Sequence, residues 1–204
     1  MTRWCGVVVA SVLCVLGAMR ADAQTMEGGV KVGIASAGMS IDDGASVPTK
    51  SRTGLVAGAF VRRVVEDNPL GIQVEALVTQ KGVKFPGDDA EIKITYVEVP
   101  LLARYAVELS GGARPYVVAG PSLAIRMATA YVPKLDAELP ELIARTDAGL
   151  VLGGGVDVGR LVLDARYTLG LKNVLSADWL YYVNETGSGK NRAFTVTVGY
   201  RFGE

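Results

Sequence analysis

The chain has 204 residues, 21 basic and 21 acidic side chains, and no histidine. This length suits one domain, the balanced charge gives no reason to expect a nucleic acid partner, and the lack of histidine removes the commonest metal ligand and general base. Both cysteines, Cys5 and Cys14, lie within the first 23 residues. We therefore expect the rest of the chain to be stabilised by packing or by a membrane rather than by disulfides.

Residues 1–23 have the three parts of a secretory signal peptide. Arg3 makes the start positive, an apolar run follows over 7–16, and Ala21-Asp22-Ala23 is a typical cleavage site. The apolar run is too short to span a bilayer, which needs about 20 residues. We therefore expect an exported protein whose mature part, residues 24–204, forms one domain.

From residue 24 onward, apolar and polar residues alternate with a period of two. In 72–81, the even positions as far as Val78 are apolar, whereas Gln73, Glu75 and Thr79 occupy odd positions. This alternation predicts β-strands and not helices. Applied along the chain, it predicts strands near 29–37, 52–65, 70–82, 92–107, 114–128, 146–158, 161–172 and 192–202.

These predicted strands suit a membrane-spanning barrel. No apolar stretch after residue 24 reaches 18 residues, so a span of the membrane would need a closed barrel. Most of the strands have the 10 or so residues that a tilted membrane strand requires. Their connections alternate between long and short, like external loops and periplasmic turns. The predicted fold is all-β, a single closed antiparallel up-and-down transmembrane β-barrel of about eight strands in the cell outer membrane.

The polar face of the strands combines charges of both signs with small residues such as Gly153 and Gly155. A solvated face would carry more lysine and fewer glycines, so we interpret this face as a narrow lumen whose charges form pairs. Tyr105, Tyr167, Tyr200 and Phe202 end the apolar face as candidate girdle residues. The predicted lumen network consists of Glu75, Glu98, Arg104, Asp164, Arg166 and Arg201. Strand order suggests the pairs Glu75–Arg104 and Asp164–Arg201.

Short motifs spread over the mature chain carry a family resemblance. They are Gly29-Val30-Lys31-Val32-Gly33, Val74-Glu75-Ala76-Leu77, Tyr96-Val97-Glu98-Val99-Pro100, Arg114-Pro115-Tyr116, Asp164-Ala165-Arg166-Tyr167 and Gly199-Tyr200-Arg201-Phe202. As an ordered set, they resemble the PorT-like outer-membrane β-barrel proteins, which are small barrels of about eight strands. The end departs from the pattern, because Gly203 and Glu204 follow the final aromatic residue. The resemblance implies a location and a fold, and it implies no activity.

No pattern in the sequence points to catalysis, to a cofactor or to a metal site. The acidic groups at 42–43 and 88–91 are interpreted as solvated loop tips rather than as carboxylate pairs or a calcium site. The segment 153–155 has no lysine at the spacing of a phosphate loop. Trp179, Tyr181 and Tyr182 form a candidate exposed patch that either contacts a partner or extends the barrel wall.

The sequence therefore leaves two functions open. The first is a non-catalytic outer-membrane barrel with a charged, largely filled lumen, which is structural or interacts with another envelope protein. The second is a barrel that carries small apolar ligands, either a lipocalin-like carrier or a narrow conduit. An eight-stranded barrel leaves an interior that side chains nearly fill. The contents of the lumen decide between the two functions. In the first function, outer-membrane lipid is expected to surround the barrel.

Overall fold

The computed structural model describes residues 24–42, 50–65, 68–84, 91–132, 145–171 and 188–202. The predicted signal peptide at 1–23, with both cysteines, lies outside these residues, and so does the candidate patch of Trp179, Tyr181 and Tyr182. No helix in the described part of the chain is long and apolar enough to cross a membrane.

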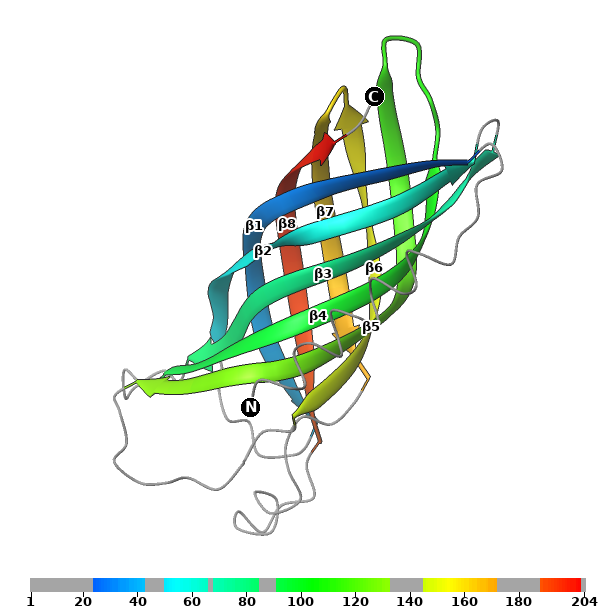
Figure 1. Cartoon of the computed structure of the whole chain (residues 1–204). Helices are drawn as coiled ribbons and strands as arrows, with labels where there is room; N and C mark the ends of the chain where they lie inside the picture. Colours follow the sequence, from blue (N-terminus) through cyan, green and yellow to red (C-terminus); the bar gives the residue numbers. More distant parts are fainter. Residues whose placement is uncertain are drawn as a thin grey trace, which may run out of the picture.

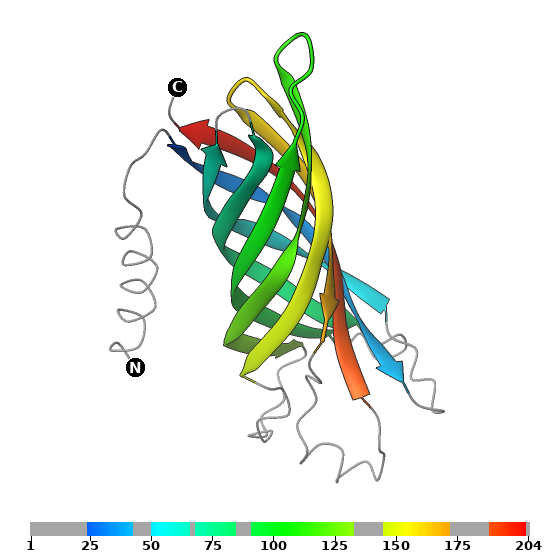
Figure 2. The ribbon, with the colours of Figure 1, turned by 90° about the vertical axis from the view of Figure 1, so that its right-hand side faces the viewer.

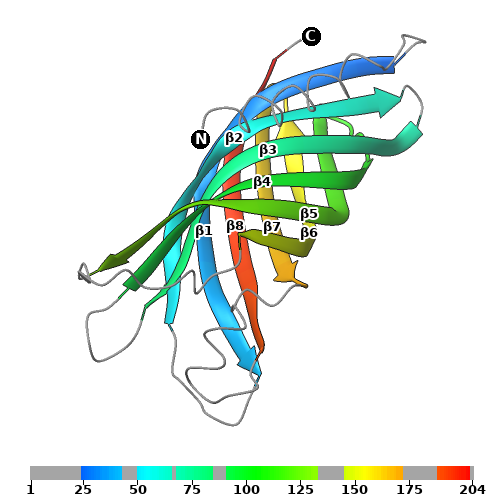
Figure 3. The same ribbon diagram turned by 60° about the horizontal axis from the view of Figure 1, so that its bottom comes forward.

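Eight antiparallel strands form one closed barrel, which confirms the predicted fold (Figure 1). Each strand pairs with the next in the sequence, and β1 also pairs with β8 to close the wall. Figure 3 shows this closure, with β1 beside β8 and the strands steeply tilted. The strands are β1 (Gln24–Asp42), β2 (Lys50–Val65), β3 (Asn68–Lys84), β4 (Glu91–Ala106), β5 (Ala113–Val132), β6 (Thr146–Val158), β7 (Leu161–Gly170) and β8 (Ser188–Phe202).

The strand limits agree with the alternation except where the alternation fades. β1 is much longer than the predicted 29–37, because its last residues pair with β8 as far as Asp42↔Ser188 although the apolar residues change from even to odd positions after Ile34. Backbone pairing with a neighbour extends these strands where side-chain alternation gives no signal.

The connections gather at two ends of the barrel. The strand ends that flank 66–67, 107–112 and 159–160 lie at one end of the barrel, the turn end, in the upper part of Figures 1 and 2. The strand ends that flank 43–49, 85–90, 133–145 and 171–187 lie at the other end, the loop end. At the turn end, Gly111, Gly112 and Gly159 have positive φ angles that favour glycine. The expected alternation in length fails once, because 85–90 and 107–112 both have six residues.

The two faces of each strand have opposite chemistry, and the polar one faces inward. In β7, Val162, Asp164 and Arg166 are buried, whereas Leu163 and Tyr167 are exposed on the outside of the barrel. The same reversal of the usual soluble pattern holds along β5, where Val117 and Leu123 are 59% and 65% exposed. The outside of the barrel is therefore apolar, whereas the inside combines buried ionic groups with apolar side chains such as Phe60, Leu102 and Val151.

Candidate functional site

A central cluster of four charged side chains lies in the middle of the lumen. Arg166 on β7 donates two hydrogen bonds to Glu75 on β3, with distances of 2.6 Å from Nη1 to Oε2 and 2.8 Å from Nη2 to Oε1. Lys31 on β1 donates to the same Glu75 carboxylate, with its Nζ 2.9 Å from Oε1. Glu75 thus receives both cations across the barrel, from strands that do not adjoin β3.

Asp164 completes the central cluster. Its Oδ2 accepts hydrogen bonds from Arg166 Nη2 at 2.7 Å and from the Tyr116 hydroxyl at 3.0 Å, and Lys31 Nζ lies 3.9 Å away. Two carboxylates therefore meet two cations. With Tyr116 on β5, the side chains of the cluster come from four strands, β1, β3, β5 and β7. Because removing one partner from such a buried pair costs about 3–5 kcal/mol, this cluster resists separation of the barrel wall.

Glycines opposite large side chains make room for this cluster. Gly155 is the register partner of Tyr116, and a Cβ at Gly155 would lie 2.5 Å from the Tyr116 hydroxyl oxygen. Gly29 stands in the same relation to Phe60, whose ring atom Cζ would be 2.5 Å from an added Cβ. At Gly155 an added Cβ would also lie 2.0 Å from the Leu163 carbonyl oxygen, so the close approach of the neighbouring backbone requires glycine there as much as the Tyr116 side chain does.

A second cluster lies near the turn end. Arg62 joins two carboxylates, with its Nε 2.5 Å from Glu27 Oε2 and its Nη2 2.7 Å from Asp157 Oδ2. Arg104 donates from Nη2 to the same Asp157 oxygen at 2.8 Å, and Arg201 pairs with Glu27. These contacts connect β1, β2, β4, β6 and β8.

A third, smaller group lies toward the loop end. Lys81 forms an ion pair with Glu98, and its Nζ also lies 5.6 Å from the centroid of the Tyr96 ring. Asn191 Nδ2 donates to Asp147 Oδ2 at 2.8 Å. Ionic contacts thus occur at three levels along the barrel axis.

All six charged residues predicted for the lumen lie inside the barrel, but the two predicted pairs are wrong. Glu75 binds Lys31 and Arg166 instead of Arg104, because the register partner of Arg104 on β3 is Gly71, four residues before Glu75. Four strand residues correspond to about 13 Å. Strands that adjoin therefore need not place their charges at the same height.

The same stagger explains why the second predicted pair, Asp164–Arg201, is wrong. Thr197 is the register partner of Asp164, so Arg201 lies four residues further along β8 and pairs with Glu27. Asp164 binds Arg166 on its own strand. Strand order is readable from the sequence, but the stagger between strands is not.

Sequence reasoning did not find Glu27, Lys31, Arg62, Asp147 and Asp157 as lumen residues. Their parity was available, because Lys31 lies between Gly29 and Gly33 on the polar face of β1. Arg62 is harder to place, since Arg63 follows it and the pair shows no alternation. Lys31 and Asp157 each lie between two valines, so the alternation itself could have placed them on the inward face.

Side chains of the described residues leave small cavities in the interior. Cavities of about 10 and 20 Å³ are lined by lumen residues, among them Lys81 and Asp147 in the first and Lys31 and Asp164 in the second. A cavity of this size holds about one water molecule. Within the described residues, no group of three or more acidic, histidine or cysteine side chains is arranged to hold a metal ion.

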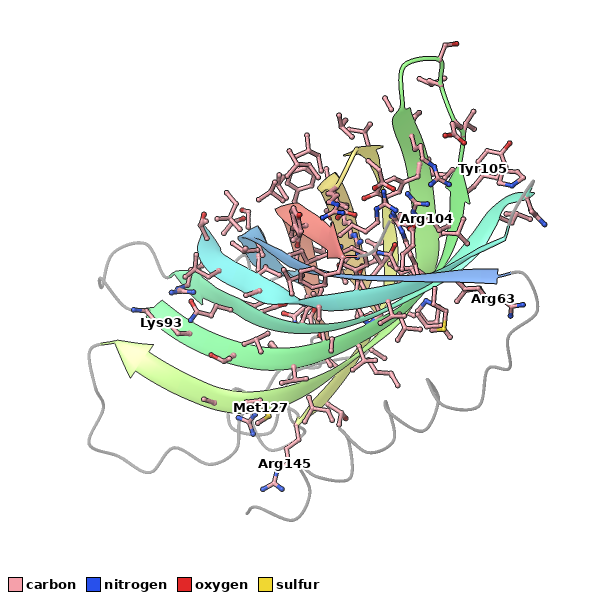
Figure 4. All side chains as sticks on the ribbon, turned by 45° about the horizontal axis from the view of Figure 1, so that its top comes forward. Arg63, Lys93, Arg104, Tyr105, Met127 and Arg145 are labelled. Atoms are coloured by element: carbon pink, nitrogen blue, oxygen red, sulfur yellow. The ribbon has the colours of Figure 1, made fainter. Side chains whose placement is uncertain are left out.

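The outward aromatic residues lie at two heights. Tyr200 and Phe202 contact each other near the turn end, with ring centroids 5.8 Å apart, and Tyr105 lies at the same end (Figure 4). Tyr167 is instead the register partner of Phe194, six residues along β8 from Tyr200. Tyr167 therefore lies at a different height from the other three candidate girdle residues.

The sequence matches the model of a protein family described as outer membrane protein β-barrel domain, over residues 22–176. No curated protein matches the sequence. Among solved structures, the barrel is similar to Neisserial surface protein A (NspA), with a TM-score of 0.52 and 15% sequence identity, covering 89% of this chain and 100% of that one. At this identity, the likeness shows a shared fold.

Two other outer-membrane structures superpose less well. Ail, the attachment invasion locus protein of Yersinia pestis, has a TM-score of 0.42 at 16% identity and covers 86% of this chain and 98% of its own. OprG from Pseudomonas aeruginosa has a TM-score of 0.42 at 14% identity and covers 89% and 96%. The family model spans more than half of the chain, and the chain therefore belongs to the outer membrane protein β-barrel domain family.

Proposed function

We propose that this protein is a non-catalytic barrel of the outer membrane, exported by a cleaved signal peptide, that seals its own lumen and interacts with another envelope protein through its loop end. The loop end then faces the cell surface, and the turn end faces the periplasm. Within the family, the finer assignment that we propose is to the PorT-like barrels that the motifs resemble.

The observation that carries the proposal is the combination of an apolar outside with an ion-paired inside. On β5, the outward residues Val117, Ala119, Pro121, Leu123, Ile125 and Met127 are all apolar and exposed. Ten residues correspond to about 33 Å along a strand, or about 25 Å of height at a tilt of about 40°. This height suits the apolar band of an outer-membrane barrel.

The filled lumen supports an interaction role over transport. Cavities of about 10 and 20 Å³ hold single water molecules, whereas a small apolar ligand needs a continuous apolar space. The charged lining adds a cost, because an apolar ligand would leave ionic groups without water or partners. The carrier or conduit function therefore has no support in the described interior.

Fractionation of cells that express the full chain tests the proposal. We expect the protein in the outer-membrane fraction, shortened at its N-terminus by about 23 residues. Protease added to intact cells should cut within 133–145 or 171–187 and spare 66–67. Recovery in the soluble periplasm would refute the membrane location, and cleavage at 66–67 in intact cells would reverse the orientation.

A further inference from the structure

A small pocket opens at the turn end, beside the first residues of β3. Its volume is about 20 Å³, and its lining includes Arg63, Asn68, Leu70, Gly71, Arg104 and Arg114. Gly71 is the register partner of Arg104, has the same parity as the buried Gln73, and has no side chain to fill the space beside the guanidinium. No carboxylate of the described residues lines this pocket.

The arginines at this end outnumber the carboxylates that face them. Arg114 is the register partner of Asp157 and therefore faces the lumen, but Asp157 is already bound by Arg62 and Arg104 at 2.7 and 2.8 Å. Glu27, the other buried acid here, is shared by Arg62 and Arg201. Four lumen arginines thus share two carboxylates among the described residues.

Donor groups in the pocket wall lack acceptors. The Nε atoms of Arg104 and Arg114 are buried and have no hydrogen-bond acceptor within the described chain, and Arg104 is only 4% exposed. Asn68 uses its Oδ1 to accept from the Leu70 backbone N–H at 2.9 Å, which leaves its side-chain NH₂ group free to donate. Asn68 is exposed, whereas the two Nε atoms are buried donors of the kind that normally has partners, so the pocket suits an acceptor that carries negative charge.

We propose that this pocket binds a phosphate-type oxyanion, either the phosphodiester of a phospholipid headgroup or phosphate free in solution. Arginine presents a planar set of donors that matches phosphate oxygens, and two arginines balance the charge of the group. The pocket volume admits one or two oxygen atoms, while the remainder of the anion stays at the open mouth.

The surroundings of the pocket make a lipid source reasonable. Leu70 and Ile72 are 57% and 50% exposed on the outside of β3, so the apolar surface begins at the height of the pocket. Arg63, which also lines the pocket, is the register partner of the outward-facing Ile72. A headgroup at the edge of the apolar surface would meet these cations.

Calorimetric titration of sodium phosphate into the folded protein, in an uncharged detergent at constant ionic strength, tests the proposal. We expect saturable binding by the wild type and a loss of at least about 10-fold in affinity for Arg114→Gln, which removes a charge-assisted contact. Asn68→Asp should lose as much, because it keeps the acceptor for Leu70 N–H and adds a negative charge to the pocket. Arg160→Gln is the matched control, since Arg160 is an exposed arginine of the same end that contacts Tyr200 outside the pocket.

The possible outcomes show whether the phosphate site exists and which molecule supplies the phosphate group. Absence of saturable heat in the wild type would overturn the proposal, as would equal losses in Arg160→Gln and Arg114→Gln, which would indicate general charge screening. Phosphate binding in detergent that disappears in phospholipid nanodiscs would assign the pocket to a headgroup, and binding that persists there would assign it to free phosphate. The detergent titration needs only the folded barrel, so its failure would leave the proposed location and orientation untouched.

Discussion

The two faces of each strand obey different rules. On the outside, Ile34, Val196 and Ala165 lie side by side in register and share only their apolar character. On the inside, Glu75 makes specific contacts with Arg166 and Lys31 from across the barrel. The outer face therefore depends on the class of residue, whereas the inner face depends on which residue meets which.

This difference explains what the sequence could and could not predict. Parity alone placed Glu75, Asp164 and Arg166 on the inward face, because a period of two fixes the side of a strand on which a residue lies. Partners depend on the stagger between strands, which in a closed barrel shifts each strand relative to the next. Arg104 and Arg201 were assigned wrong partners for that reason alone.

The limits of the strands show a similar division. β7 was predicted almost to its ends because its alternation is unbroken, with Leu161 and Leu163 outside and Val162 and Asp164 inside. The far end of β1 was missed because its apolar residues change from even to odd positions after Ile34. The signal peptide and the patch around Trp179 stay predictions, since both lie outside the described residues.

The largest effect is expected at the centre of the lumen. Glu75→Ala should lower the free energy of unfolding by about 3–5 kcal/mol, because Arg166 and Lys31 would remain buried without their shared partner. Urea unfolding of the detergent-folded protein, followed by its gel mobility without boiling, measures this loss. A loss under about 1 kcal/mol would mean that water screens the pair.

A charge placed on the outer face should have the next largest effect. Val196 is 43% exposed on the outside, and Val196→Arg should cost about 2–4 kcal/mol in a bilayer if this height lies near the midplane. Val196→Leu, which changes shape but not polarity, should stay within about 0.5 kcal/mol. Equal stability of the two variants in lipid vesicles would show that this face does not meet the apolar core of a membrane.

A smaller loss is expected where a glycine makes room for a lumen side chain. Gly155→Ala would bring a Cβ within 2.0 Å of the Leu163 carbonyl oxygen and within 2.5 Å of the Tyr116 hydroxyl oxygen, and such overpacking costs about 1–3 kcal/mol. Gly28→Ala is the control, because its Cβ would meet nothing closer than the Phe60 carbonyl oxygen at 3.8 Å. Thermal unfolding of both variants measures the difference, and similar midpoints would imply that Tyr116 relocates freely.

A double-mutant cycle on the lumen charges tests the central claim, that specific ion pairs across the barrel hold the interior together. The account predicts a coupling energy of about 1–3 kcal/mol between Glu75→Gln and Arg166→Gln, which remove two groups in direct contact. It predicts additive effects for Glu75→Gln with Arg104→Gln, since Arg104 contacts Asp157 instead. Additivity in the first cycle, or coupling of similar size in the second, would contradict the pairing described for the lumen.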